Sequence, residues 1–169
     1  MTTMSTATVD VSGLADRYEI ETLVHRVGLA LDEGRFDDLR AIYTDDAVVR
    51  TPGGVGEGID ALVAQAARNH LPDDAIQHLI TGVLIDLDPE GDRATIRANH
   101  VVVFVYRDPA AVPLTPLWSE PPTAVGAVYR FTARRTAAGW RLTSMVSEPV
   151  WASFSVVRPA SPPPSRPAA

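Results

Sequence analysis

Two amino acids are missing from this chain of 169 residues: it has no cysteine, and all 15 of its basic side chains other than histidine are arginines. Without cysteine the sequence forms no disulfide, no thiolate nucleophile and no zinc finger. Without lysine it has neither the usual Schiff-base amine nor the lysine of a Walker A phosphate loop. These two absences exclude several classes of covalent and nucleotide-dependent catalysis.

Long apolar runs and an excess of positive charge are also lacking. No segment approaches the roughly 18 consecutive apolar residues of a membrane span, and the first residues show neither the basic nor the apolar region of a secretory signal. The net charge is −6 at pH 7, which disfavours nucleic acid and anionic membranes as partners. We therefore expect a protein that binds neither, and we take the cytoplasm as its default location.

Metal-binding and dinucleotide-binding patterns are not evident either. The four histidines are scattered, with no pair spaced by four residues and no His-x-His. The glycine-rich run GVGEG at 54–58 mimics a dinucleotide loop, but its third glycine comes too early and no βαβ unit follows. We interpret it as a turn, and we expect neither a metal nor a cofactor.

Length and composition indicate one domain. Hydrophobic residues make up 46% of the chain, enough for a single sizeable core. The small polar residues at the start and the proline, alanine and serine at the end bury little apolar surface. We expect a disordered N-terminus over 1–12, one domain over 13–157 and a disordered proline-rich tail over 158–169.

The apolar periodicity changes along the chain from helical to strand-like. It predicts helices at 14–32, 36–43 and 59–69, and strands at 47–51, 76–87, 93–106, 124–135 and 140–150, with 154–157 as a candidate extension. Helices followed by a meander of strands are typical of an α+β fold with helices on one face of an antiparallel sheet. The proline-rich segment between the strand pairs includes Trp118, and its length fits a lid or binding loop as well as a plain surface excursion.

One acidic side chain stands at the end of the first predicted helix. At about 100° per residue, Asp32 lies far from the apolar stripe centred on Val27 and Leu31. The residues alone therefore favour a solvated helix end for Asp32.

Two histidines lie within predicted strands. His78 occupies the first long strand, and His100 shares one face of the next strand with Ile96, Ala98, Val102 and Phe104 if the period is two. A buried histidine needs a hydrogen-bonding partner, which a site or a purely structural contact would supply. We expect the other two histidines, His25 and His70, on the surface.

The order of these elements, the strand start AIQHLITG and the final GWRL resemble the SnoaL-like branch of the nuclear transport factor 2-like superfamily, over about residues 14–154. The nearest pattern is that of scytalone dehydratase and the polyketide cyclases. The resemblance implies a cone-like, curved antiparallel sheet packed around N-terminal helices and enclosing an apolar pocket. It also implies self-association, with a homodimer as the expected state.

The resemblance further implies roles for particular residues. Asp32 would orient and charge His100 as the base, and His78 would be the acid or the anchor for a carbonyl group. The expected substrate-positioning residues are Thr51, Phe104, Trp118 and Tyr129. Thr51 and Tyr129 stand where scytalone dehydratase has a tyrosine and an asparagine, which argues against scytalone itself as the substrate.

We accordingly expect a cofactor-independent dehydratase, isomerase or cyclase acting on a small apolar oxygenated molecule, such as a polyketide- or sterol-like compound. Two alternatives stay open on the same fold. One is a non-catalytic module that binds a small ligand, and the other is a structural subunit like the small subunit of ring-hydroxylating oxygenases.

Overall fold

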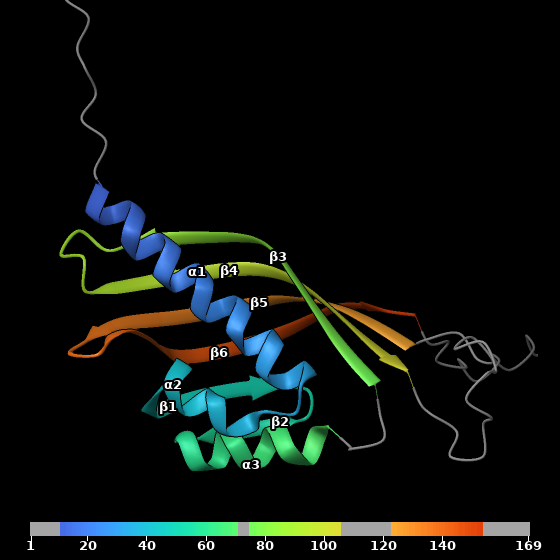
Figure 1. The fold of residues 1–169 in the computed structure, drawn as a ribbon. Coiled ribbons are helices and arrows are strands. Elements are labelled where there is room, and N and C mark those ends of the chain that lie inside the picture. The colour runs from blue at the N-terminus through green and yellow to red at the C-terminus, as the bar shows by residue number, and fades with distance from the viewer. Residues whose placement is uncertain (1–10, 71–74, 106–122, 154–169) are drawn as a thin grey trace, which may run out of the picture.

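The computed structural model describes residues 11–70, 75–105 and 123–153. In chain order these form α1 (Val11–Asp32), η1 (Phe36–Asp38), α2 (Leu39–Ile42), β1 (Tyr43–Thr51), β2 (Gly54–Glu57), α3 (Ile59–Asn69), β3 (Ala75–Leu87), β4 (Arg93–Val105), β5 (Thr123–Thr136) and β6 (Gly139–Ala152). Helix α1 lies across one face of the sheet, with α2 and α3 beside it (Figure 1). The α+β class is confirmed. Residues 11 and 12, predicted as part of a disordered N-terminus, belong to α1, whereas residues 1–10, Trp118, the candidate strand extension 154–157 and the predicted tail 158–169 lie outside the described residues.

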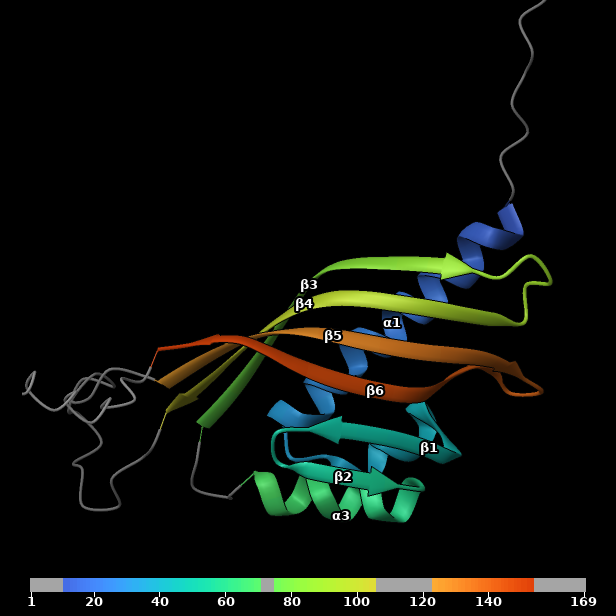
Figure 2. The ribbon, with the colours of Figure 1, turned by 180° about the vertical axis from the view of Figure 1, so that it is seen from behind.

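The six strands form one mixed sheet in the order β2-β1-β6-β5-β4-β3 (Figure 2). Strands β3 to β6 are an antiparallel meander, as predicted. Strand β1, however, pairs in parallel with β6, so the expectation of a wholly antiparallel sheet is wrong at this position. The first and last strands meet only through tertiary folding, and no local pattern in either strand records their relative direction.

Strand β2 is a second departure from the expectation, because the glycine-rich run was interpreted as a turn. Gly54 and Gly56 pair with Thr51 and Val49 in an antiparallel hairpin that extends the sheet by one short edge strand. Gly54 has φ 131° and Gly58 has φ 82°, a region that favours glycine. Glycine contributes no side chain to an alternating pattern, which is why periodicity did not reveal this strand.

The sheet is curved, and the sharpest bend lies in β3. The register between β3 and β4 shifts between Thr81 and Leu84, where Gly82 has φ 59°. Such a bulge increases the local twist and bends the strand. Figure 1 shows β3 bending at its middle, with its first half beside the C-terminal end of α1.

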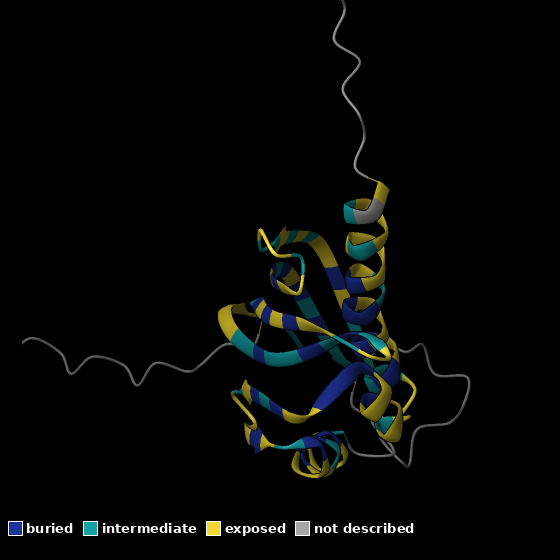
Figure 3. Cartoon of the chain, turned by 90° about the vertical axis from the view of Figure 1, so that its left-hand side faces the viewer, coloured by how far each residue is buried: buried dark blue, intermediate teal, exposed yellow. Residues whose placement is uncertain are grey.

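The core lies between α1 and the inner face of the sheet. The apolar stripe of α1 predicted from the sequence is buried, from Ile20 to Ala30. The largest fully buried side chains include Trp140 and Phe131. Buried and exposed residues alternate along the strands, as expected for a sheet with one packed face (Figure 3). Among the described residues, no helix is both long and apolar enough to cross a membrane.

Candidate active site

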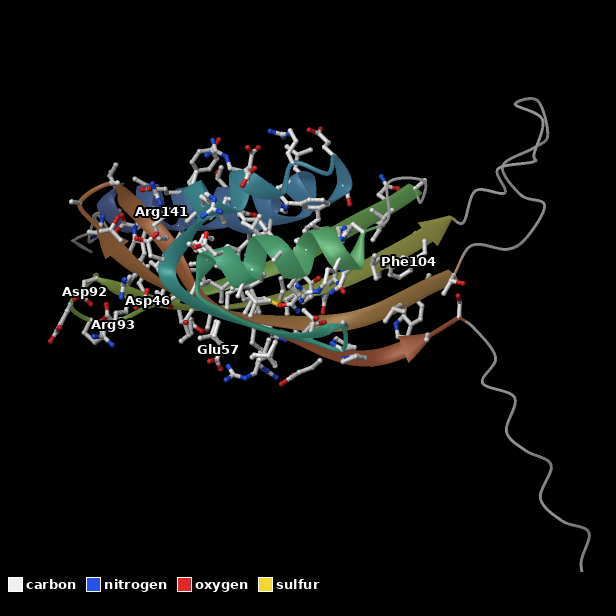
Figure 4. The ribbon with its side chains drawn as sticks, turned by 90° about the horizontal axis from the view of Figure 1, so that it is seen from below. Asp46, Glu57, Asp92, Arg93, Phe104 and Arg141 are labelled. Atoms are coloured by element: carbon white, nitrogen blue, oxygen red, sulfur yellow. The ribbon has the colours of Figure 1, made fainter. Side chains whose placement is uncertain are left out.

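A cavity of about 640 Å³ lies between α1, α3 and the inner face of the sheet. Its walls are mostly aliphatic and aromatic, and the side chains with polar atoms that line it are Tyr43, Thr51, Gln65, Asn69, His70, His78, His100, Tyr129, Ser147 and Trp151. Phe104, which also lines it, lies toward one end of the sheet, well away from Asp92 and Arg93 at the other (Figure 4). An apolar cavity of this size with a few convergent polar groups is typical of a small-molecule site.

Asp32 is bound to His78, whose side chain lines this cavity, while Asp32 itself is not one of the lining residues. The carboxylate Oδ1 lies 2.6 Å from Nδ1 of His78. The backbone N–H of His78 donates to both carboxylate oxygens, at 2.9 and 3.1 Å. The side chain of His78 is 6% exposed and that of Asp32 is 23% exposed. Since an ionised carboxylate only accepts hydrogen bonds, Nδ1 carries the imidazole proton and Nε2 keeps its lone pair.

The helical wheel predicts a solvated helix end for Asp32, and this prediction is wrong. Gly28 explains why. A Cβ atom at Gly28 would lie 3.3 Å from Ile80 Cδ1 and 3.4 Å from His78 Cβ. The missing side chain therefore lets β3 pack against α1 on this side, outside the apolar stripe. Asp32 follows four residues later on the same side of the helix, facing His78. The helix ends there, with Gly34 at φ 66° and the Arg35 N–H donating to the Ala30 carbonyl.

Burial and the neighbouring carboxylate have opposite effects on the pKa of His78. Burial lowers the pKa of His78 below the ordinary histidine value of 6.5, and the hydrogen bond that its ring donates to Asp32 offsets this shift only in part. The imidazole is therefore neutral at pH 7, with its acceptor nitrogen free of a proton. A neutral imidazole held by a carboxylate is the arrangement of a general base.

His100 pairs with Tyr129 and not with Asp32, so the predicted Asp32–His100 pair is wrong. The Tyr129 hydroxyl lies 3.2 Å from Nε2 of His100. The physical reason is the strand order: β3 is the edge strand that packs on α1, and His100 belongs to β4, one strand further away. His100 does face the pocket, on the register chosen from the sequence, whereas Asn99 is exposed.

The buried pair of His100 and Tyr129 is electrically neutral. Burial lowers the pKa of His100 to about 3, and the neighbouring His78 adds to this shift. Burial also raises the pKa of Tyr129 well above its ordinary value of 10.0. The phenol therefore keeps its proton at any physiological pH and is available as a hydrogen-bond donor.

The site includes a histidine that sequence reasoning assigned to the surface. His70, directly after α3, lines the cavity, and its ring centroid lies 5.7 Å from that of His78. His78 is in turn 5.2 Å from His100, which stacks on Tyr129 at 4.1 Å. Four rings, from three neighbouring strands and the residue after α3, thus form one row along the pocket. The only local signal for His70 was its place just beyond the end of a helix, whereas His25 is exposed as expected.

The remaining predicted residues contribute in different ways. Phe104 lines the cavity. Thr51 also lines it, but its hydroxyl accepts hydrogen bonds from the Gln65 amide at 3.2 Å and from the Gly53 N–H at 3.1 Å. Its visible role is therefore to hold Gln65. Trp118 lies outside the described residues.

Among the described residues, the one cluster whose ligand atoms lie close enough for a metal ion is Asp88, Glu90 and Asp92. It belongs to the turn between β3 and β4, away from the cavity. The three pocket histidines are not part of such a cluster, and Nδ1 of His70 and of His78 already have partners.

The fold and the site together define a class of protein: a curved sheet closed by one long helix, with a carboxylate–histidine pair at the wall of an apolar pocket. The sequence places the chain in a particular family of this class. It belongs to the SnoaL-like domain family, whose model matches residues 12–146. No protein of curated function matches the sequence closely enough to serve as a relative.

Solved structures agree with this fold. A protein from Kribbella flavida is 26% identical, with a TM-score of 0.70, and the match covers 83% of this chain and 94% of that one. A hexachlorocyclohexane dehydrochlorinase from Novosphingobium barchaimii is 17% identical, with a TM-score of 0.71 and coverage of 91% and 99%. A protein from Novosphingobium aromaticivorans, provisionally named a scytalone dehydratase, is 18% identical, with a TM-score of 0.70 and coverage of 91% and 97%.

Proposed function

We propose that the protein is a cofactor-independent acid/base enzyme of the lyase or isomerase type, acting on a small, largely apolar, oxygenated molecule. The observation that carries this proposal is the 2.6 Å contact between Asp32 and Nδ1 of His78 at the wall of the apolar cavity. The contact orients the ring and leaves Nε2 as the proton acceptor. His78 therefore takes the role of base that the sequence had assigned to His100.

The chemistry begins with removal of a proton from a carbon next to a carbonyl group or next to the carbon that bears a leaving group. Nε2 of His78 accepts the proton, and the C–H electron pair moves into a new carbon–carbon double bond. In an elimination, the leaving group departs with its bonding electron pair. In an isomerisation, the charge collects on the carbonyl oxygen, and the imidazolium then returns the proton to a different carbon of the enolate. Asp32 stabilises the imidazolium that forms, as carboxylates do in other histidine dyads.

His100 and Tyr129 supply the complementary hydrogen bond. With its proton on Nε2, His100 donates to the Tyr129 oxygen, and the phenol O–H is then free to donate to a substrate oxygen. In a pocket of low polarity, such a donor stabilises a developing oxyanion more than it would in water. Two of the solved structures with this fold are named for eliminations, a dehydrochlorinase and a dehydratase, and both reactions suit a base of this kind.

The proposal is tested by deuterium exchange at the α-carbon of a bound apolar ketone, 2-tetralone, in D₂O, followed by mass spectrometry. The wild type should accelerate exchange, and Asp32→Asn should reduce the acceleration by about 10²–10⁴. His78→Gln should abolish it. His25→Gln, which changes an exposed histidine on the outer side of α1, is the matched control and should have no effect.

Circular dichroism would show that each variant is folded. Full exchange activity in Asp32→Asn or His78→Gln would overturn the assignment of the base. Binding of 2-tetralone by the wild type without exchange would instead favour the binding module that the sequence left open.

A further inference from the structure

His70 has one nitrogen in use and one without a partner. Its Nδ1 lies 2.7 Å from the backbone carbonyl of Ala66, in the last turn of α3. A carbonyl only accepts hydrogen bonds, so Nδ1 donates, and the carbonyl would otherwise be one of the unsatisfied groups of a helix end. In the neutral ring, Nε2 is consequently an acceptor.

That acceptor is buried and receives no hydrogen bond from any residue that the structure describes. The ring is held in place by Phe36 on one side, at 5.5 Å between centroids, and by His78 on the other, at 5.7 Å. It also lines the cavity. Buried polar atoms in folded proteins nearly always have a partner, and an exception needs an explanation. A ligand in the cavity that carries a donor would supply one.

The surroundings restrict what that donor can be. Most of the side chains around the cavity are apolar, and a charged ammonium group placed among them would lose its hydration without a carboxylate from the described cavity lining to replace it. A hydroxyl group provides one neutral donor at lower cost. We propose that His70 is a specificity-determining residue whose Nε2 accepts a hydrogen bond from a hydroxyl group of the substrate.

The spacing of the two imidazoles adds to the substrate's description. His70 and His78 are neighbours in the row of rings, so one carbocyclic ring can present its hydroxyl group to His70 and an adjacent C–H to His78. The preferred substrate is thus a carbocycle that carries a hydroxyl group for His70 in addition to the carbonyl group or leaving group that activates the C–H, not merely an apolar molecule. This step rests on the proposed function for the role of His78, whereas the hydroxyl contact at His70 does not depend on turnover.

The test compares two probes of similar shape, 2-naphthol and 2-methoxynaphthalene, of which only the first has a hydrogen-bond donor. Binding of each is measured by isothermal titration calorimetry at pH 8, where imidazoles are neutral. The wild type should prefer 2-naphthol by about tenfold or more, because the methoxy probe leaves a buried acceptor unpaired.

Three variants test whether the preference for 2-naphthol depends on His70. His70→Phe keeps an aromatic ring between Phe36 and His78 but removes the acceptor, and it should bind both probes about equally. His70→Gln offers an amide N–H for the Ala66 carbonyl and an amide oxygen in place of Nε2, and it should recover part of the preference. His25→Phe is the matched change at an exposed histidine and should behave as the wild type.

A full preference for 2-naphthol in a folded His70→Phe variant would overturn the proposal, since the donor would then bind elsewhere. The absence of any preference in the wild type, including failure to bind either probe, would overturn it as well. Asp32→Asn separates this result from the proposed function: it should lose ketone exchange yet keep its preference for 2-naphthol. If wild-type exchange fails while the His70-dependent preference persists, the enzyme proposal falls and the hydroxyl-binding role stands.

Discussion

Asp16, Arg135 and Trp140 meet at the end of the sheet where α1 begins, and both carboxylate oxygens of Asp16 and both N–H groups of Trp140 have partners. Arg135 donates to Asp16 at 2.6 Å, and the Trp140 indole N–H donates to the same carboxylate at 3.1 Å. The Trp140 backbone N–H donates to Glu19 at 2.8 Å, and the Arg135 guanidinium lies 4.8 Å from the centre of the indole ring.

The other end of the sheet, where α1 finishes, is organised differently. There, both carboxylate oxygens of Asp32 accept hydrogen bonds from His78, and the Tyr129 hydroxyl is bonded to Nε2 of His100. Nδ1 of His100 and Nε2 of His70 nevertheless remain buried without a partner among the described residues. The end where α1 begins is thus packed and hydrogen-bonded like a core, while the end where α1 finishes has buried acceptors or donors without a partner in the described part of the chain. An aspartate anchors each end, but only at the pocket end do imidazole nitrogens stay buried without a partner among the described residues of the two groups.

The largest expected effect is on stability, at the end of the sheet where α1 begins. Trp140 is fully buried, so Trp140→Ala should lower the free energy of unfolding by about 3–5 kcal/mol. Trp151→Ala is the matched change at the pocket end, where the indole is 50% exposed and lies against Gly126. It should cost about 1 kcal/mol or less. Chemical denaturation measures both, and equal losses would show that the two ends do not differ in this way.

A smaller effect, on pH dependence, should distinguish the pocket end. The ordinary histidine pKa is 6.5 and burial lowers the pKa of His100 to about 3, so between these values the unfolded chain binds a proton that the native residue does not. Stability is therefore fully present above pH 6.5 and falls as the pH falls below it. His100→Gln keeps a partner for Tyr129 without titrating, and it should lose less stability between pH 7 and pH 4 than the wild type.

Denaturation midpoints at pH 7, 5 and 4 would measure this difference. The carboxylates contribute to acid unfolding of both proteins, including Asp16, whose pKa is lowered chiefly by its hydrogen bond to Arg135. They cancel in the comparison of the two. Parallel pH profiles for the wild type and His100→Gln would contradict the prediction.

The smallest expected effect concerns the spacing between α1 and β3. Gly28→Ala would place a Cβ atom 3.3 Å from Ile80 and 3.4 Å from His78, so the helix must move by a few tenths of an ångström. The gain of about 1 kcal/mol in helix propensity should offset the crowding, leaving the melting temperature nearly unchanged. The ketone exchange rate should fall about tenfold, because Asp32 would no longer hold His78 in register.

Exchange kinetics and thermal unfolding on the same samples would check this last prediction. Leu29→Ala changes the neighbouring, exposed position of the same helix and should leave the exchange rate unaltered. An unaltered rate in Gly28→Ala as well would mean that the close approach of the two elements is a packing feature without a role in positioning the base.

Local patterns in the sequence determined most of the elements. The third predicted helix, 59–69, has the bounds of α3, and the four long strands differ from their predicted bounds by at most two residues. Hydrophobic periodicity also placed His100 on the inner face of its strand. These features depend on neighbours within a few residues, and the chain carries that information directly.

Only the tertiary structure decided which groups meet. The parallel pairing of β1 with β6, the contact of Asp32 with His78 instead of His100, and the arrival of His70 in the pocket all join residues on separate elements. Each depends on how the elements pack in space: the register shift near Gly82 bends β3, and Gly28 lets α1 and β3 approach closely. Periodicity reports which side of an element is apolar, but it holds no record of which neighbour will cover that side.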